Sequence, residues 1–242
     1  QRPIVSERDE HALEEALLLK ERGGGTVTAV ALDSPEVDGV LFTALARGCD
    51  RAVKVTGVEG PVPTSAAAAV LAEALPTVPG LGPADLVLSG CQAIDDLDAL
   101  LAPALAERLG LPYLGIVTGV EVQPGAKRVT VTKEYAGGVR GRFDCALPAV
   151  LGVQAAEKPP RYVPVAKVRA VMKSAKLEEV AGGAAGGGGA GGALRVAEQH
   201  GASLGAEAAL DEFLKLFRSA GEEGMAKGVE PVLVGTDLVA GG

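Results

Sequence analysis

The sequence contains no tryptophan and few aromatic residues of any kind. Aromatic residues make up 3% of its 242 residues, whereas hydrophobic residues as a whole make up 48%. That fraction is sufficient for a globular core, which must therefore be built mainly from alanine, valine and leucine. At this length we expect one large domain, or one domain with an extension.

Cysteine and histidine are also scarce. Cys49, Cys91 and Cys145 are far apart in the chain, no C-x-x-C pair occurs, and there are two histidines. This composition argues against a zinc site built from cysteine and histidine. Widely separated, unpaired cysteines are typical of a reducing compartment, so we expect a cytoplasmic protein.

Positive charge and long apolar runs are the remaining deficits. The 23 lysines and arginines are outnumbered by 31 acidic residues, which gives a formal net charge of -8. Proteins that bind nucleic acid in general carry a basic face, so no nucleic-acid partner is expected. Because no apolar run approaches about 18 residues, no membrane span is expected either.

The most informative stretch is Asp85–Gly110, which predicts a strand, a turn and a helix in succession. An apolar run at Leu86–Leu88 is followed by the small residues Ser89 and Gly90, and a later apolar run stops at Gly110. A strand that passes through glycine into a helix presents backbone N–H groups to an anion. The stretch therefore predicts an anion site at one edge of a sheet.

Strands and helices are predicted to alternate up to this stretch. Helical periodicity and capping residues predict helices, and β-branched apolar runs predict strands. This alternation predicts an α/β fold with a doubly wound, mostly parallel sheet of the Rossmann-like, adenine-nucleotide-binding kind. The expected helices are 9–22, 37–47 and 65–75, and the expected strands are 26–32, 51–56 and 85–89.

After Gly110 the pattern changes to consecutive strands. Strands are expected at 113–117, 120–122, 128–132, 139–145 and 147–153, with turn residues at 123–126. Strands that follow one another without helices pair antiparallel. We therefore expect an antiparallel extension at one edge of the sheet.

The C-terminal third is expected to be less compact. Prolines make 158–164 extended, and 166–176 is basic and helical. Residues 181–193 contain only alanine and glycine, which predicts a flexible linker, and an amphipathic helix is expected at 204–219. The expected organisation is an α/β core at 1–154, a docking segment at 155–180, a linker at 181–193 and a C-terminal arm at 194–242.

Several motifs together resemble one known family. Residues 90–96 read G-C-Q-A-I-D-D, 133–138 read K-E-Y-A-G-G, and 146–150 read A-L-P-A-V. P-R-Y follows at 160–162 and M-K at 172–173. In this order they are similar to the signature motifs of the electron transfer flavoprotein β-subunit, including its FixA-type relatives. The resemblance extends over roughly residues 6–180.

The resemblance implies an electron carrier rather than an enzyme. Members of this family work as a heterodimer, in which FAD is bound mainly by the α-subunit and the β-subunit holds AMP or a second FAD. The heterodimer accepts electrons from flavin dehydrogenases such as acyl-CoA dehydrogenases. It passes them to an acceptor oxidoreductase such as a membrane quinone reductase. A C-terminal arm that wraps onto the α-subunit would account for the linker and the last helix.

The resemblance also assigns site residues, in two groups. The first group would bind the cofactor, and the second would dock a partner. The cofactor group is Ser6, Asp9, Leu32, Gly90, Cys91, Gln92, Ala93, Ile94, Asp95, Asp96 and Ala99. The docking group is Pro160, Arg161, Tyr162, Val165, Val168, Met172 and Lys173. No catalytic residue and no metal ligand is assigned.

The chain departs from the family where a nucleotide phosphate would bind. The family continues its signature with D-x-x-Q-T/V-G, but residues 97–102 read L-D-A-L-L-A. Leucine side chains donate no hydrogen bond, and three nearby acids repel an anion. Two hypotheses remain: a β-subunit that keeps an adenine nucleotide, or a degenerate docking subunit without one. In a simpler interpretation, Asp95 and Asp96 only cap the following helix.

A further departure concerns the start of the fold. The family's first strand, with a V-K-R-type sequence, has no counterpart before Ser6. Without it the sheet would have no central member, and we expect the missing residues to precede Gln1. A nucleotide-dependent enzyme on a related fold would require an S-G-G-x-D-S-type loop, which the sequence does not contain.

Overall fold

The fold was analysed in a computed structural model that describes residues 5–58, 62–93, 98–122, 125 and 127–182. Several expected features lie outside these residues. They include Ile94, Asp95 and Asp96, most of the hairpin tip, almost all of the alanine–glycine linker, and the C-terminal arm.

The described chain contains helices and strands close to those expected. The helices are α1 (Glu7–Gly23), α2 (Val37–Arg47), α3 (Thr64–Ala74), α4 (Leu101–Leu109) and α5 (Val165–Ser174). The strands are β1 (Thr28–Leu32), β2 (Arg51–Thr56), β3 (Leu86–Gly90), β4 (Tyr113–Val122), β5 (Arg128–Glu134), β6 (Arg140–Ala146), β7 (Ala149–Val153) and β8 (Glu178–Ala181). Short 3-10 turns occur at Leu75–Thr77 and Ala136–Gly138.

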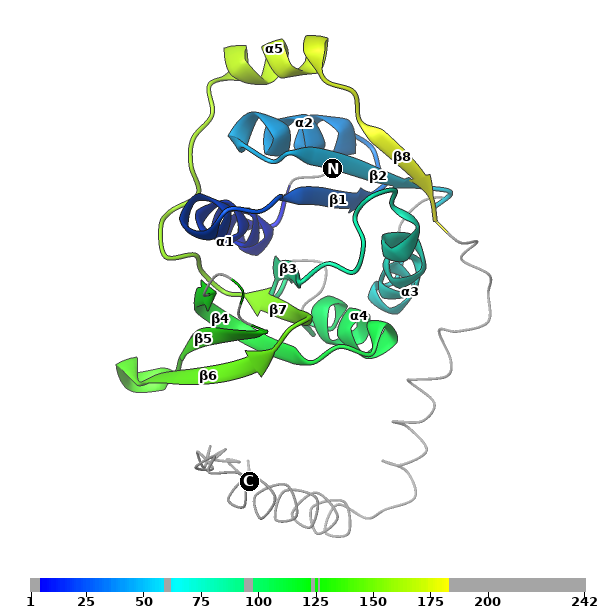
Figure 1. The fold of residues 1–242 in the computed structure, drawn as a ribbon. Coiled ribbons are helices and arrows are strands. Elements are labelled where there is room, and N and C mark those ends of the chain that lie inside the picture. Colours follow the sequence, from blue (N-terminus) through cyan, green and yellow to red (C-terminus); the bar gives the residue numbers. More distant parts are fainter. Residues whose placement is uncertain (1–4, 59–61, 94–97, 123–124, 126, 183–242) are drawn as a thin grey trace, which may run out of the picture. The chain divides into compact units, whose positions relative to one another are not determined.

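These strands form two sheets (Figure 1). One has the order β1-β2-β8 and is entirely parallel. The other has the order β3-β7-β4-β5-β6, in which β3, β7 and β4 are parallel and β5 and β6 are antiparallel additions. The α/β class, the mostly parallel strands and the antiparallel extension are therefore confirmed.

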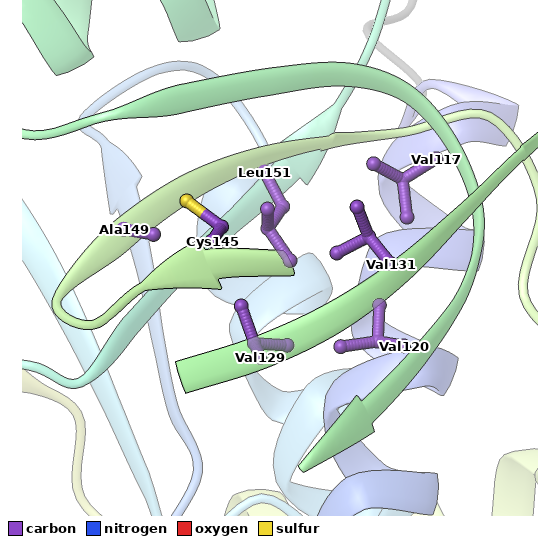
Figure 2. Packing of buried hydrophobic residues seen from close by; sticks show 7 residues of the cluster. All are labelled: Val117, Val120, Val129, Val131, Cys145, Ala149 and Leu151. Carbon is purple, nitrogen blue, oxygen red and sulfur yellow. The ribbon is translucent and has the colours of Figure 1, made fainter. Parts of the chain in front are cut away.

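Alternating residues of the central strands pack against helices on opposite faces, as a doubly wound fold requires. In β7, Leu151 belongs to an apolar cluster that α1 covers through Leu19, whereas the neighbouring Val150 packs on Ala102 and Ala106 of α4. Figure 2 shows the first cluster at the antiparallel extension. Its members are Val117, Val120, Val129, Val131, Cys145, Ala149 and Leu151.

The three-stranded sheet is covered in the same way. Ala52 of β2 packs against Val37 and Leu41 of α2. Val55, three residues further along the same strand, packs against Val70 of α3 on the opposite face. Both sheets are thus sandwiched between helices.

The division into two sheets leaves β1 and β3 as end strands, each paired on one side only. All five residues of β1 and all five of β3 are half-buried, although both strands are largely apolar. By contrast, all five residues of β7 are buried. A central parallel strand is normally buried on both faces. Among the described strands, β1 and β3 therefore differ from a central parallel strand in their burial.

Two parts of the sequence prediction were incomplete. β8 was not expected, because its sequence E-E-V-A is short and half acidic; it forms by pairing parallel to β2. The helix α4 begins at Leu101, after Leu100 as its N-cap. Asp95 and Asp96 lie outside the described residues, so the interpretation that they cap this helix stays a prediction.

Candidate functional site

The start of α1 meets the end of β3, at the edge where the sequence predicts the anion site. Ser6 is the N-cap of α1: its Oγ accepts from the Arg8 N–H and donates to the Gln92 carbonyl oxygen, each at 3.2 Å. The Asp9 carboxylate accepts from the Gly90 N–H at 2.7 Å. We call this cluster, Ser6, Asp9 and residues 90–92, the carboxyl edge.

The glycine at position 90 is required by packing within the chain. A Cβ atom built on Gly90 would lie 2.7 Å from the Arg8 Cβ and 2.8 Å from the Asp9 nitrogen. Real Cβ atoms do not approach other atoms so closely, so a side chain here would force α1 away from β3. The backbone of Gly90 therefore lies close to α1, whereas the family motif suggests that it lies close to a ligand.

Other polar groups at this edge also bond within the protein. The Arg8 guanidinium donates to the Gln154 carbonyl oxygen at 2.7 Å, and the Cys91 N–H donates to the Val153 carbonyl oxygen at 2.9 Å. The Cys91 thiol lies 3.4 Å from the Gln154 side-chain oxygen. Donors that an anion would need are thus already used by carbonyl and carboxylate oxygens of the chain.

The three cysteines are free and buried. Burial raises the pKa of the Cys91 and Cys145 thiols, and it raises the pKa of Cys49 to about 11. Reactive cysteines need the thiolate form, which these environments disfavour. Cys91 is therefore a small residue packed at the turn, where a Cβ atom built on Gly152 would lie 3.4 Å from its Cα and Cβ.

The remaining predicted cofactor residues are placed less compactly. Leu32 ends β1 in the other sheet, where it packs beside Val55 and Val70. Ala99 has a left-handed backbone, with φ of 56°, and Leu100 after it is 52% exposed. The structure therefore brings Ser6, Asp9 and residues 90–92 together but gives Leu32 a core position.

The fit of a nucleotide phosphate can be tested on these residues. A phosphate site needs backbone or side-chain donors. Among the described residues of the carboxyl edge, the Gly90 and Cys91 N–H groups and the Arg8 guanidinium are engaged internally. The Asp9 carboxylate adds negative charge at this edge. In the described conformation these three donors are therefore directed to oxygens of the chain rather than to a nucleotide phosphate.

The docking segment (residues 155–180) begins along α1. We call residues 154–161, which run beside this helix without forming a strand, the strap. The Ala156 N–H donates to His11 Nδ1 at 3.2 Å, and the Glu157 N–H donates to Glu15 at 3.1 Å. Burial raises the pKa of Glu15, although the Glu157 N–H and Arg22 oppose this shift. Side chains of α1 thus bind the backbone of the strap.

Arg161 makes the strongest of these attachments. Its backbone N–H donates to Glu14 at 3.0 Å, and its Nε and Nη2 donate to the two Glu14 oxygens at 2.8–3.1 Å. Its Nη1 donates to Glu21 at 2.6 Å. Burial would raise the pKa of Glu14, but the hydrogen bonds from Arg161 outweigh burial and lower it. We call Arg161 with Glu14 and Glu21 the Arg161 clamp.

Beyond the clamp, apolar side chains are exposed. Tyr162 is 83% exposed, Val165 62% and Met172 49%, and none of the residues of α5 is buried. Pro160 and Val168 are half-buried, whereas Lys173 is exposed beside further basic residues. Figure 1 shows α5 outside α2, at the end of the fold away from the antiparallel strands. The predicted docking residues thus form a surface, except that Arg161 is turned to α1.

The docking segment returns to the fold through β8. Arg51 of β2 donates from Nε and Nη2 to the two oxygens of Glu178, at 2.8 and 2.5 Å. Together with the parallel pairing of β2 and β8, this bidentate pair fixes the end of the segment. No local sequence pattern predicts this pair, because its partners are 127 residues apart.

A groove of about 400 Å³ lies beside the strap, between residues 155–157 and the strands β4–β6. Its charged side chains are Glu134, Arg140 and Glu157. Arg140 lies 3.9 Å from Glu134, and Glu157 pairs with Arg22 at 2.9 Å. Within the described part of the chain, no group of three or more histidine, cysteine or acidic residues could hold a metal ion.

Comparison with known proteins decides the family. The family model for the electron transfer flavoprotein domain matches residues 1–185. The chain belongs to the electron transfer flavoprotein family. Its resemblance to the β-subunit and FixA-type members is also confirmed, and members of this family take part in electron transfer.

Curated relatives give the same result. The chain is 36% identical over 171 residues to the electron transfer flavoprotein subunit beta of Syntrophomonas wolfei, which covers 70% of this chain and 65% of the relative. It is 33% identical over 182 residues to that of Bacillus subtilis (73% and 66%), and 32% identical over 154 residues to Protein FixA of Azotobacter vinelandii (61% and 53%). The chain thus spans about two thirds or less of these relatives.

No helix within the described residues is both long and apolar enough to cross a membrane.

Proposed function

We propose that the chain acts as the β-type subunit of an electron transfer flavoprotein. In this role it helps carry electrons from a flavin dehydrogenase, of the acyl-CoA dehydrogenase type, to an acceptor oxidoreductase such as a membrane quinone reductase. The observation that carries the proposal is the exposed apolar surface of the docking segment. Tyr162, Val165 and Met172 lie exposed at the motifs that the family presents to its partners.

The chain is a docking subunit rather than a catalyst in this proposal. An α-subunit partner would carry the FAD, which supplies the electron-accepting chemistry. Exposed Lys167, Arg169 and Lys173 surround the apolar side chains of α5 and favour a partner with an acidic rim. Three free, buried cysteines suit a reducing cytoplasm.

We further propose that this subunit holds no nucleotide phosphate of its own. This choice favours the hypothesis of a docking subunit without bound AMP over one that retains it. The support comes from the Gly90 and Cys91 N–H groups, which already bond to Asp9 and Val153. Leu100 and Leu101, at the start of α4, supply no side-chain donor.

Co-expression with an electron transfer flavoprotein α-subunit tests the proposal. Purification through a tag on this chain should recover a heterodimer with a flavin absorbance spectrum. An acyl-CoA dehydrogenase reduced by its substrate should then bleach that spectrum. A lone chain without flavin, or a flavin that no dehydrogenase reduces, would contradict the electron-carrier role.

A further inference from the structure

The strap is bound to α1 by a row of contacts at helical spacing. Arg8, His11 and Glu15 follow one another at intervals of three and four residues, which places them on one face of α1. They bond to the backbone of residues 154, 156 and 157 in the same order. Glu14, beside this row, binds the backbone N–H of Arg161. The strap is therefore fixed up to residue 161.

Arg161 is the last fixed point before the exposed surface. Three nitrogens of its guanidinium donate to Glu14 and Glu21, so its charge is neutralised by two carboxylates of α1. The Glu14 side chain is 4% exposed, so water competes little for this contact. The next residue, Tyr162, is 83% exposed. Arg161 is thus directed into the protein at the position where the neighbouring side chain turns outward.

The far end of the exposed surface is fixed by an equivalent pair. Glu178 binds Arg51 in a bidentate manner, but its side chain is 39% exposed. Between the two pairs, none of the residues of α5 is buried. The helix α5 contacts α2 but contributes nothing to the buried core. Its position therefore depends on its contact with α2 and on its two ends, of which the Arg161 clamp is the more sheltered from solvent.

We propose that Arg161 is a positioning residue, whose clamp to Glu14 and Glu21 fixes Tyr162 and Val165 in the conformation that a flavin dehydrogenase binds. This inference rests on the docking function proposed above. A surface that is ordered before encounter loses less conformational entropy on binding, and so it binds more tightly. Arg161 acts through Glu14 and does not itself touch the partner.

Electron transfer kinetics of the intact heterodimer test this role. The variant Arg161→Lys keeps the charge but cannot form the planar, bidentate contact. Its KM as electron acceptor for a reduced acyl-CoA dehydrogenase should rise about fivefold to twentyfold, while kcat stays within twofold. Reduction of the same flavin by dithionite, which needs no docking, should not change. The matched control is Arg142→Lys, which alters an exposed pair with Glu121 on the antiparallel strands and should leave KM unchanged.

A double-mutant cycle separates positioning from a general loss of structure. Tyr162→Ala alone should raise KM, and Arg161→Lys should raise KM by a smaller factor in that background than in the wild type, because one of the two side chains that the clamp positions is gone. Glu21→Gln removes one contact of the clamp and should raise KM less than Arg161→Lys does. If Arg161→Lys does not assemble with the α-subunit, Glu21→Gln provides the same test in milder form.

The outcomes distinguish the inference from the function on which it rests. If Tyr162→Ala raises KM but Arg161→Lys and Glu21→Gln do not, the docking function holds and the positioning role is wrong. The positioning role is also wrong if the effects of Arg161→Lys and Tyr162→Ala on KM simply multiply. If none of these variants changes KM, the docking function itself fails.

Discussion

The carboxyl edge and the docking segment both carry family motifs, yet they differ in what they offer a ligand. At the carboxyl edge, polar groups bond to one another: Asp9 binds the Gly90 N–H and Arg8 binds the Gln154 carbonyl. In the docking segment, large apolar side chains such as Tyr162 and Val165 are exposed.

The difference shows that two motifs of the same family can have different physical roles in this chain. Gly90 is kept as glycine because α1 leaves no room for a Cβ atom there. No comparable packing requires a large apolar side chain at position 162, where most of the surface faces solvent. Internal packing therefore accounts for the first motif, whereas an exposed aromatic residue is typical of a site that contacts a partner.

The largest expected effect is that of a side chain at position 90. Gly90→Ala should destabilise the protein by about 2–3 kcal/mol, because its Cβ would clash with the backbone of α1. Urea unfolding measures this change. The control is Gly39→Ala within α2, where a Cβ meets no atom within 4 Å, and the helix should gain up to about 1 kcal/mol. Equal effects of the two substitutions would remove the packing explanation.

A smaller loss is expected when the partner of Gly90 is removed. Asp9→Ala leaves the Gly90 N–H without its acceptor, which should cost about 1–2 kcal/mol. Asp98→Ala is the matched control, because Asp98 is exposed, and it should change stability by less than about 0.5 kcal/mol. If Asp9→Ala instead stabilises the protein, the Asp9 carboxylate destabilises the fold. That result would indicate that Asp9 serves to bind a ligand and not to hold β3 against α1.

The Arg161 clamp predicts a local dependence on pH. The pKa of Glu14 is lowered from 4.5, so its stabilisation is complete above pH 4.5 and is lost as the pH falls through the lowered pKa. Glu15, with a raised pKa, contributes with the opposite sign, so overall stability is a poor probe. Carbon-13 NMR should show the Glu14 carboxyl titrating below 4.5, and at a higher pH in Arg161→Lys. An unchanged midpoint in that variant would show that Arg161 does not hold Glu14 charged.

The smallest effect on stability is expected in the docking segment. Tyr162→Ala and Met172→Ser should change the free energy of unfolding by less than about 0.5 kcal/mol, since neither residue belongs to the buried core: Tyr162 is 83% and Met172 49% exposed. Thermal or urea unfolding checks this directly. A loss above about 2 kcal/mol would mean that these side chains support the fold, and the comparison between the two regions would no longer hold.

Local sequence patterns were sufficient for most of the fold. The residues of α2 and β2 have the predicted bounds, because apolar periodicity and a terminal glycine at position 48 mark them clearly. β8 could not be predicted, because its E-E-V-A sequence becomes a strand only by pairing with β2. The single strand β4 was predicted as two, since Thr118 and Gly119 interrupt its apolar pattern at the point where its register with β5 also shifts.

The candidate site was predictable in its membership but less so in its chemistry. Residues 6, 9 and 90–92 do come together, as the strand-turn-helix pattern indicates. The sequence could not show that Asp9 uses the Gly90 N–H, because that bond joins residues 81 apart. For the same reason Arg161 was assigned to the partner surface, whereas its guanidinium binds Glu14, which is 147 residues away. Contacts between distant residues decided both cases.

We propose that this electron transfer flavoprotein subunit holds no nucleotide phosphate at its carboxyl edge. The most direct test is to denature the purified heterodimer and quantify the nucleotides it releases. The account predicts one FAD per heterodimer and no AMP. One AMP per heterodimer, or a second FAD, would contradict it.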